Sequence, residues 1–208
     1  MLLIAGLGNP GPQYAGHRHN VGFMAADAIH QVWGFEPWRR RFQAEAAEGV
    51  LSTPAGGRVK TLLLKPQTFM NDSGRAIGEA ARFYKIPPQD VVVLYDELDL
   101  APGRFRMKTG GGHAGHNGVR SIIAQYDREM RRGRIGIGHP GDKSRVHGYV
   151  LSNFAKADQA WVDALTDALA RAAPFLAAGD DERYQADVMR LAPAPKGDPR
   201  KSAAPTED

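Results

Sequence analysis

The sequence predicts an α/β fold, a single-domain sandwich in which helices flank a twisted, mixed and largely parallel sheet. Short apolar or alternating runs, which predict strands, take turns along the chain with longer segments whose apolar residues recur at helical spacing. That alternation is typical of strand–helix–strand units. The 208 residues also suffice for one domain with a proper core.

The strands are predicted from runs that end at glycine, proline or a polar residue. Residues 2–6 form an apolar run that stops at Gly6, and Pro66 stops a later run. Residues 104–108 alternate charged and apolar side chains, as a half-buried strand does, so their cations would share one face. The predicted strands are 2–6, 43–51, 58–65, 91–95, 104–108 and 134–138.

The helices are predicted from apolar spacing and from capping residues. Asn20 and Asn117 are candidate N-caps for two of them, and Asn71 or Ser73 starts another. The predicted helices are 20–33, 71–84, 117–126 and 156–178.

The end of the chain differs in composition from the rest. From Ala192 onward there are four prolines, three basic residues, three acidic residues and no large apolar side chain. Such a segment buries too little apolar surface to offset its ordering entropy. We therefore expect one folded domain at 1–191 and a disordered tail at 192–208.

Composition excludes several classes of protein. There is no cysteine, which excludes disulfides, thiolate zinc sites and a cysteine nucleophile, and favours a cytoplasmic location. We expect no signal peptide and no membrane helix, because no apolar run approaches roughly 18 residues. The net charge is +4. Basic clusters such as 128–134 are often solvated helix faces, but the strand at 104–108 favours an anionic partner, with phosphate the leading candidate.

Polar residues gather in turns next to the predicted strands and helices. The segment 110–118 holds five glycines, two histidines and an asparagine, which lets backbone approach a partner closely. Other turns present Asn9, His19 and Asn71, and Asp96 ends a strand. Ligands of open α/β sheets bind at the carboxyl ends of strands, so we expect one polar site assembled from these turns.

The sequence gives little support for a dinucleotide site, a metal site or a serine nucleophile. Gly6-x-Gly-x-x-Gly11 matches a dinucleotide fingerprint, and a nucleotide-dependent oxidoreductase rests on it alone, but Pro10 and Pro12 lack the N–H groups that a pyrophosphate needs. His113-x-x-His116 and the acidic run at 96–99 are candidate metal ligands without a specified third partner, so we expect no metal. No Gly-x-Ser-x-Gly motif is present, which argues against a covalent intermediate.

The remaining groups favour general-base chemistry on water. His19 lies in a polar turn between Arg18 and Asn20, which argues against a structural core histidine. A carboxylate beside an imidazole favours the charged ring, raises its basicity and holds one tautomer.

Five motifs occur in the order and spacing of a known family from Met1 to about residue 190: 6–11 with 18–22, 65–74, 96–100, 110–118 and 134–142. With them the chain resembles bacterial peptidyl-tRNA hydrolase. The resemblance implies a monomeric enzyme with a mixed α/β sheet, no metal, no cofactor and no obligate protein partner. It also implies hydrolysis of the ester that joins a peptide to the 3′ ribose of tRNA, which recycles tRNA from peptidyl-tRNA released prematurely by ribosomes.

The resemblance also implies roles for single residues. His19 would be the base that activates water, and Asp96 would hold it in its basic form. Asn9 would distinguish a blocked amine from a free one. The implied substrate-binding residues are Asn9, Tyr14, Phe69, Met70, Asn71, His116 and Asn117. The residues expected to bind tRNA phosphate are Arg106, Lys108 and Arg134.

The chain departs from the family pattern at two positions. The family usually has Phe-x-Arg-Leu-Arg where this chain has Met130-Arg-Arg-Gly-Arg134, so Gly133 is expected to leave Arg134 less firmly held. The family commonly has threonine where this chain has His17. A non-catalytic RNA-binding protein with this fold is the rival interpretation; loss of His19 or Asp96 would indicate it, and both are present.

Overall fold

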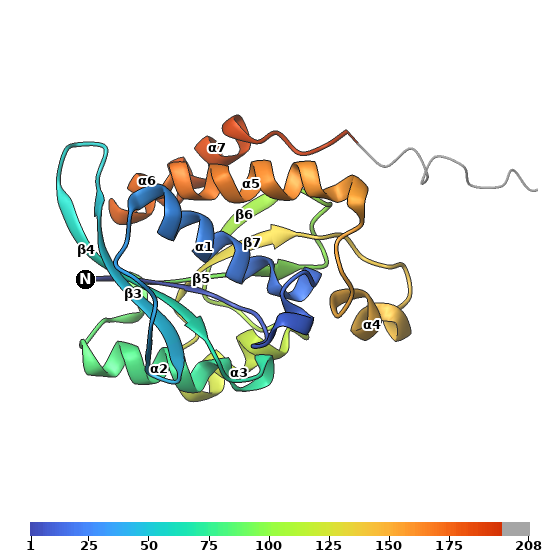
Figure 1. Ribbon diagram of the computed structural model, residues 1–208, viewed down its shortest axis with the longest axis horizontal. Helices are drawn as coiled ribbons and strands as arrows, with labels where there is room; N and C mark the ends of the chain where they lie inside the picture. The colour runs from blue at the N-terminus through green and yellow to red at the C-terminus, as the bar shows by residue number, and fades with distance from the viewer. Residues whose placement is uncertain (197–208) are drawn as a thin grey trace, which may run out of the picture.

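The computed structural model describes residues 1–196 and contains a seven-stranded sheet in the order β2-β3-β4-β1-β5-β7-β6 (Figure 1). Strand β1 pairs in parallel with β4 and β5, and β5 pairs in parallel with β7. The outer pairs β2–β3, β3–β4 and β6–β7 are antiparallel. The predicted mixed sheet is confirmed, with its parallel strands at the centre. The strands are β1 (Leu2–Gly6), β2 (Arg39–Arg41), β3 (Ala44–Ser52), β4 (Arg58–Pro66), β5 (Val91–Glu97), β6 (Phe105–Thr109) and β7 (Arg131–Gly136).

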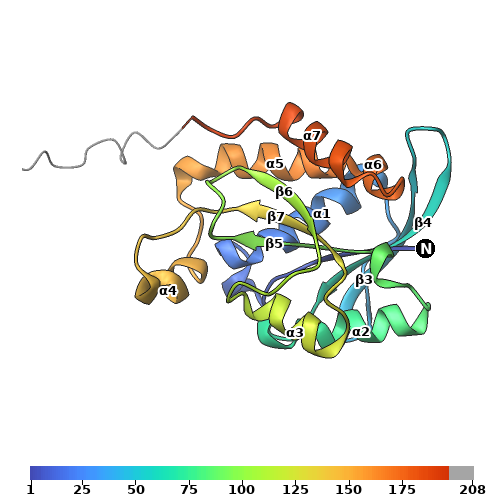
Figure 2. The same ribbon diagram turned by 180° about the vertical axis from the view of Figure 1, so that it is seen from behind.

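Helices cover both faces of the sheet (Figures 1 and 2). Helices α1, α5, α6 and α7 lie over one face, and α2 and α3 lie over the other. This double cover explains why the central strands are continuous apolar runs, since both faces of a parallel strand are then buried. The helices are α1 (Val21–Trp33), α2 (Ser73–Phe83), α3 (Asn117–Gln125), α4 (Val146–Val150), α5 (Gln159–Arg171), α6 (Ala173–Ala177) and α7 (Asp181–Leu191).

Most predicted elements agree with the structure to within two residues at each end, and two differ by more. The predicted helix at 156–178 is divided, because α5 ends at Arg171 and α6 carries Pro174 in its first turn. Proline has no N–H to donate to the carbonyl four residues earlier. The strand predicted at 134–138 begins at Arg131, since Arg131 and Arg132 are buried strand residues rather than members of an exposed basic cluster. Strand β2 and helices α4 and α7 were not predicted from the sequence.

The predicted amide caps also need correction. Asn20 occupies the N-cap position of α1, but its side chain makes no capping hydrogen bond. Helix α3 is capped by His116 and not by Asn117. Nδ1 of His116 accepts from the backbone N–H groups of Gly118 at 3.1 Å and Val119 at 3.3 Å. A histidine is therefore fixed at the start of α3.

The chain continues after α7 without regular structure as far as residue 196. Ala192 is buried, and a Cβ built on Gly103 would lie 2.6 Å from Cδ of Pro195. The rest of the predicted tail, 197–208, lies outside the described residues, so the domain boundary at 191 stays a prediction. No helix within 1–196 combines the length and apolarity that crossing a bilayer requires.

Candidate active site

Close backbone packing brings His19 to the end of β5. A Cβ on Gly6 would lie 2.0 Å from the carbonyl oxygen of Gly22, and a Cβ on Gly22 would lie 2.3 Å from that of Leu94. Only glycine at both positions lets α1 start directly against β1 and β5. The 3₁₀ turn Arg18–Asn20, which precedes α1, thereby carries His19 to Asp96.

His19, Asp96 and His116 form a hydrogen-bonded chain. Nδ1 of His19 lies 2.7 Å from Oδ2 of Asp96, and Nε2 of His116 lies 2.8 Å from Oδ1 of the same carboxylate. Because Nδ1 of His116 accepts from two backbone amides, the proton of its neutral ring is on Nε2 and is donated to Asp96. An ionised carboxylate only accepts, so His19 donates from Nδ1. Nε2 of His19 is then the nitrogen that remains available to take a proton.

The electrostatics of this chain depend on the burial of Asp96, which is 2% exposed. Burial alone would raise the pKa of the Asp96 carboxyl, but the His19 and His116 rings beside it hold that pKa well below its usual range. Burial also lowers the pKa of His19, and the Asp96 carboxylate outweighs this, so the net shift of the His19 pKa is upward. Asp96 is therefore ionised at neutral pH, and His19 is a stronger base than a free imidazole.

Asn9 and Asn20 bind each other next to the hydrogen-bonded residues His19, Asp96 and His116. The backbone N–H of Asn9 donates to Oδ1 of Asn20 at 2.9 Å, and Nδ2 of Asn20 donates to the carbonyl of Asn9 at 2.9 Å. Oδ1 of Asn9 accepts from the backbone N–H of Met70 at 2.8 Å. Oδ1 of Asn9 thus has a partner, and the NH₂ group has none among the described residues, so the NH₂ group is the better candidate to meet a ligand. Sequence patterns marked Asn20 only as a helix cap.

The other candidate substrate-binding residues come from three turns. Tyr14 and Phe69 form an edge-to-face pair with ring centroids 6.3 Å apart, and Phe69 is 58% exposed. Met70 is buried, and a Cβ on Gly118 would lie 2.6 Å from its sulfur. The amide side chains of Asn71 and Asn117 are exposed and make no hydrogen bond to another described residue.

The structure bears on two cofactor interpretations, a metal ion and a dinucleotide. His19, Asp96 and His116 offer three ligand atoms within 4.8 Å of one another, but these atoms already form hydrogen bonds that a metal ion would have to displace. His113 of the His-x-x-His pair is outside this group, and its Nδ1 accepts from Gly115. The dinucleotide interpretation is wrong, because a 3₁₀ turn and not an α-helix follows the glycines after β1.

Arg106, Lys108 and Arg134 share one face of the β6–β7 pair. Arg106 lies opposite Arg134 in the antiparallel register, and Lys108 lies opposite Arg132. Directly opposite residues point to the same face, and like charges in that arrangement destabilise the pair. Among these four cations, within the described residues, Arg134 alone has a carboxylate partner, Oε1 of Glu97 at 3.5 Å. The expectation that the cations of this strand share a face is confirmed.

Gly133 does not leave a gap beside Arg134, contrary to expectation. A Cβ at this position would lie 2.5 Å from Cδ2 of Leu94 and 3.1 Å from the ring of Phe105, so larger neighbours fill the space. Side chains alternate along a strand, which puts this contact on the face away from Arg134. Glu97, whose importance the acidic motif alone did not indicate, is what holds Arg134.

Arg18 ties the turn of His19 to the segment that follows α4. Its Nη1 donates to Oγ of Ser152 at 2.6 Å and to the carbonyl of Asn153 at 2.9 Å, and its guanidinium lies 4.2 Å from the ring centroid of Tyr149. In the sequence, Arg18 is only a polar neighbour of His19 within the motif 18–22. Nothing in the local pattern indicates a partner more than 130 residues away.

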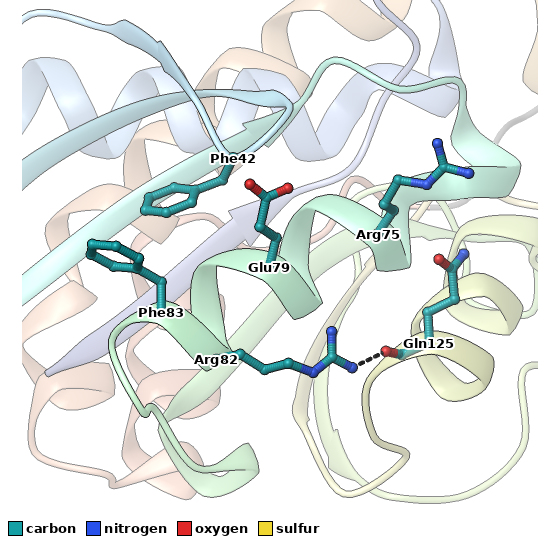
Figure 3. Close-up of a pocket in the computed structure, with 6 residues that line it drawn as sticks. All are labelled: Phe42, Arg75, Glu79, Arg82, Phe83 and Gln125. Carbon is teal, nitrogen blue, oxygen red and sulfur yellow. Dashed lines mark hydrogen bonds between the residues drawn. The ribbon is translucent and has the colours of Figure 1, made fainter.

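A groove of about 550 Å³ lies beside α2 (Figure 3). It is lined by Phe42, Arg75, Glu79, Arg82, Phe83 and Gln125. Arg82 donates to the backbone carbonyl of Gln125, Arg75 pairs with Asp72, and Glu79 accepts from Gln43. None of the candidate site residues lines this groove, and its charged groups are already paired.

Comparison with known proteins identifies the family. The family model described as peptidyl-tRNA hydrolase matches residues 3–195. A peptidyl-tRNA hydrolase from Phenylobacterium zucineum is 64% identical, covering 98% of this chain and 97% of that protein, and one from Caulobacter vibrioides is 62% identical, with 98% of each covered. A crystal structure of peptidyl-tRNA hydrolase from Acinetobacter baumannii superposes with a TM-score of 0.84 at 37% identity, covering 93% of this chain and 97% of that one. The chain therefore belongs to the peptidyl-tRNA hydrolase family of enzymes.

Proposed function

We propose that the chain hydrolyses the ester between a peptide, or an N-blocked aminoacyl group, and the 3′ ribose of tRNA, with His19 as general base. The observation that carries this proposal is the hydrogen-bonded chain of His19, Asp96 and His116, which leaves Nε2 of His19 unprotonated. Membership of the family supports the same substrate.

In the proposed reaction, Nε2 of His19 removes a proton from a water molecule as the water oxygen attacks the ester carbonyl. Asp96 stays ionised and stabilises the imidazolium that forms, because it accepts a hydrogen bond from Nδ1–H of His19 throughout. The tetrahedral intermediate then expels the ribose oxygen, which takes the proton back from Nε2. The products are a free peptide carboxylic acid and tRNA with an intact ribose, and His19 returns to its starting state.

Asn9 is proposed to select blocked amines through its NH₂ group. Oδ1 already accepts from the amide of Met70, so the NH₂ group is the part of the side chain that lacks a partner among the described residues, and we propose that it donates to the ligand. A peptide or acetyl group offers a carbonyl at that point, whereas a free α-ammonium offers only donors and a charge. Burying the ammonium opposite another donor is costly, which would disfavour aminoacyl-tRNA.

Arg106, Lys108 and Arg134 are proposed to bind phosphates of the tRNA. Cations set opposite each other on one strand pair destabilise the free protein, and an anion between them would relieve that repulsion. Arg106 and Lys108 are exposed, so they are available for such contacts. Phosphate contacts of this kind fix position and affinity and carry no sequence information.

We also propose where the enzyme acts and in which oligomeric state. We place the enzyme in the cytoplasm, as a monomer without an obligate protein partner, acting on peptidyl-tRNA released prematurely by ribosomes. Light scattering on the purified protein tests the monomer, because a stable dimer would double the measured mass.

The central test is a hydrolysis assay with N-acetyl-aminoacyl-tRNA. His19→Ala should lose about 10²–10⁴-fold in kcat, the usual contribution of a general base, and keep its fold. His113→Ala is the matched control, since His113 lies outside the hydrogen-bonded chain and should keep wild-type activity. Wild-type turnover by His19→Ala would disprove the proposed base, and equal losses in both variants would revive the His-x-x-His interpretation.

A further inference from the structure

Arg132 is a buried cation that binds the backbone of the glycine-rich segment 110–118. Its side chain is among the largest that are fully buried, with 1% exposed. Nη1 donates to the carbonyl of Gly112 at 2.5 Å, and Nη2 donates to the carbonyls of Gly111 at 2.7 Å and Arg128 at 3.1 Å. No carboxylate within the described residues forms a salt bridge with it, and its Nε is buried without a partner.

The neighbouring Arg131 is a structural arginine with a carboxylate partner, which Arg132 lacks among the described residues. Arg131 points to the other face of β7, where its Nε lies 3.0 and 3.1 Å from the two carboxylate oxygens of Asp181. A buried guanidinium without such a counter-ion is a poor way to stabilise a fold, because burying an unpaired charge is costly and an apolar residue of similar volume often packs as well. Three backbone carbonyls compensate the charge of Arg132, and the two at the shortest distances belong to Gly111 and Gly112, so we take its role to concern the glycine-rich segment.

Hydrogen bonds to His113 from the N–H groups of Gly115 and His116 hold the second half of the segment, whereas Arg132 holds the glycines of its first half. Gly110 and Gly111 have φ values of +68° and +89°, and a run of glycines loses more conformational entropy on ordering than any other sequence. The planar fork of a guanidinium matches two consecutive carbonyls, which a single ammonium cannot do. Four residues after Gly112 the same segment reaches His116, whose two nitrogens must meet Asp96 and the amides of α3 together.

We propose that Arg132 is a positioning residue for ester hydrolysis. Its guanidinium fixes the carbonyls of Gly111 and Gly112, and this holds His116 against Asp96 and sets Asn117 at the mouth of the site. Arg132 acts through the backbone of the glycine-rich segment and touches neither substrate nor water. The inference rests on the proposed role of the His19–Asp96–His116 chain.

Kinetics on N-acetyl-aminoacyl-tRNA tests the inference with three variants. Arg132→Met should lower kcat by about 10–100-fold, the effect of a misplacement on the order of 1 Å, with KM nearly unchanged. Arg132→Lys keeps the charge without the fork and should also lose kcat, and it decides the question if Arg132→Met does not fold. Arg131→Met is the matched control, which should melt at a lower temperature yet keep wild-type kcat in its folded state.

The ring nitrogens of His116 give a readout that loss of stability alone would not change. In wild type, ¹⁵N NMR should find Nδ1 unprotonated and Nε2 protonated, and both Arg132 variants should show a mixture of tautomers or exchange broadening. Arg131→Met should give the wild-type spectrum. Wild-type kcat and an unchanged His116 spectrum in the folded Arg132 variants would overturn the inference. If His19→Ala proved active, the proposed base would fail, whereas the His116 spectrum would still report on Arg132.

Discussion

Replacing Asp96 by asparagine tests the hydrogen-bonded chain most sharply, because the structure determines how the new amide must lie. Nδ1 of His116 is committed to the amides of Gly118 and Val119, so its Nε2–H can only donate. In Asp96→Asn the amide carbonyl must therefore face His116. The NH₂ group then faces His19 and donates to Nδ1, which moves the His19 proton to Nε2.

This wrong tautomer removes the base, since Nε2 is the atom that we expect to take the proton from water. The same substitution in serine protease triads costs about 10⁴-fold in kcat for the same reason, and we expect a loss of about 10³–10⁴-fold here. Losing the carboxylate also lowers the pKa of His19, because Asp96 is what raises it. Activity requires neutral His19, so the acid limb of the residual pH–rate profile should move to lower pH.

The assay is the pH dependence of kcat/KM for N-acetyl-aminoacyl-tRNA, together with ¹⁵N NMR of the His19 ring. Adding His116→Ala to Asp96→Asn frees the amide to rotate, so the double variant should be no slower than Asp96→Asn and should regain some Nδ1–H tautomer. A single variant that keeps kcat within about tenfold of wild type, with Nδ1 of His19 still protonated, would refute the reasoning.

Four further outcomes are expected. Asn9→Asp keeps an acceptor for Met70 and replaces the NH₂ group by oxygen, so the kcat/KM ratio between N-acetyl-aminoacyl-tRNA and aminoacyl-tRNA should shrink; an unchanged ratio would limit Asn9 to shaping the turn. Lys108→Ala should raise KM and flatten its salt dependence by about one phosphate contact, whereas Arg40→Ala at the far sheet edge should not. Gly133→Leu should destabilise the fold by about 1–3 kcal/mol in thermal melts. EDTA should leave turnover unchanged once loss of tRNA folding is controlled for, and reversal of inhibition by one divalent ion would show metal dependence.

The parts of the site that follow directly from strand ends were predictable from the sequence. Asp96 follows the apolar run at 91–95, which is typical of a buried strand, and the turn holding Asn9 follows the run at 2–6. Both positions need only a short continuous apolar run and the rule that ligands bind at the carboxyl ends of strands. The strand of alternating cations was predictable for the same reason.

Contacts between distant segments were not predictable by these means. Asn20 looks like a helix cap, yet it binds the backbone of Asn9. His116 looks like a loop residue, yet it caps α3 and binds Asp96. The local sequence offers each side chain a plausible role, and tertiary packing adds a distant hydrogen-bond partner that the local sequence does not indicate. The arginines at 131 and 132 read as surface charge, because nothing in the local sequence distinguishes a buried arginine from an exposed one.

The proton on Nδ1 of His19 connects Asp96, His116 and Arg132. His19 needs an ionised carboxylate at Nδ1, and burying that carboxylate is unfavourable unless donors surround it. Asp96 therefore has a second donor, His116, whose tautomer is set by its capping role in α3. The glycines that let the backbone carry His116 to this place give it no rigidity of their own, and the fork of Arg132 supplies it. Arg132, a buried arginine without a counter-ion among the described residues, is thus explained by a proposed base whose free nitrogen must be Nε2.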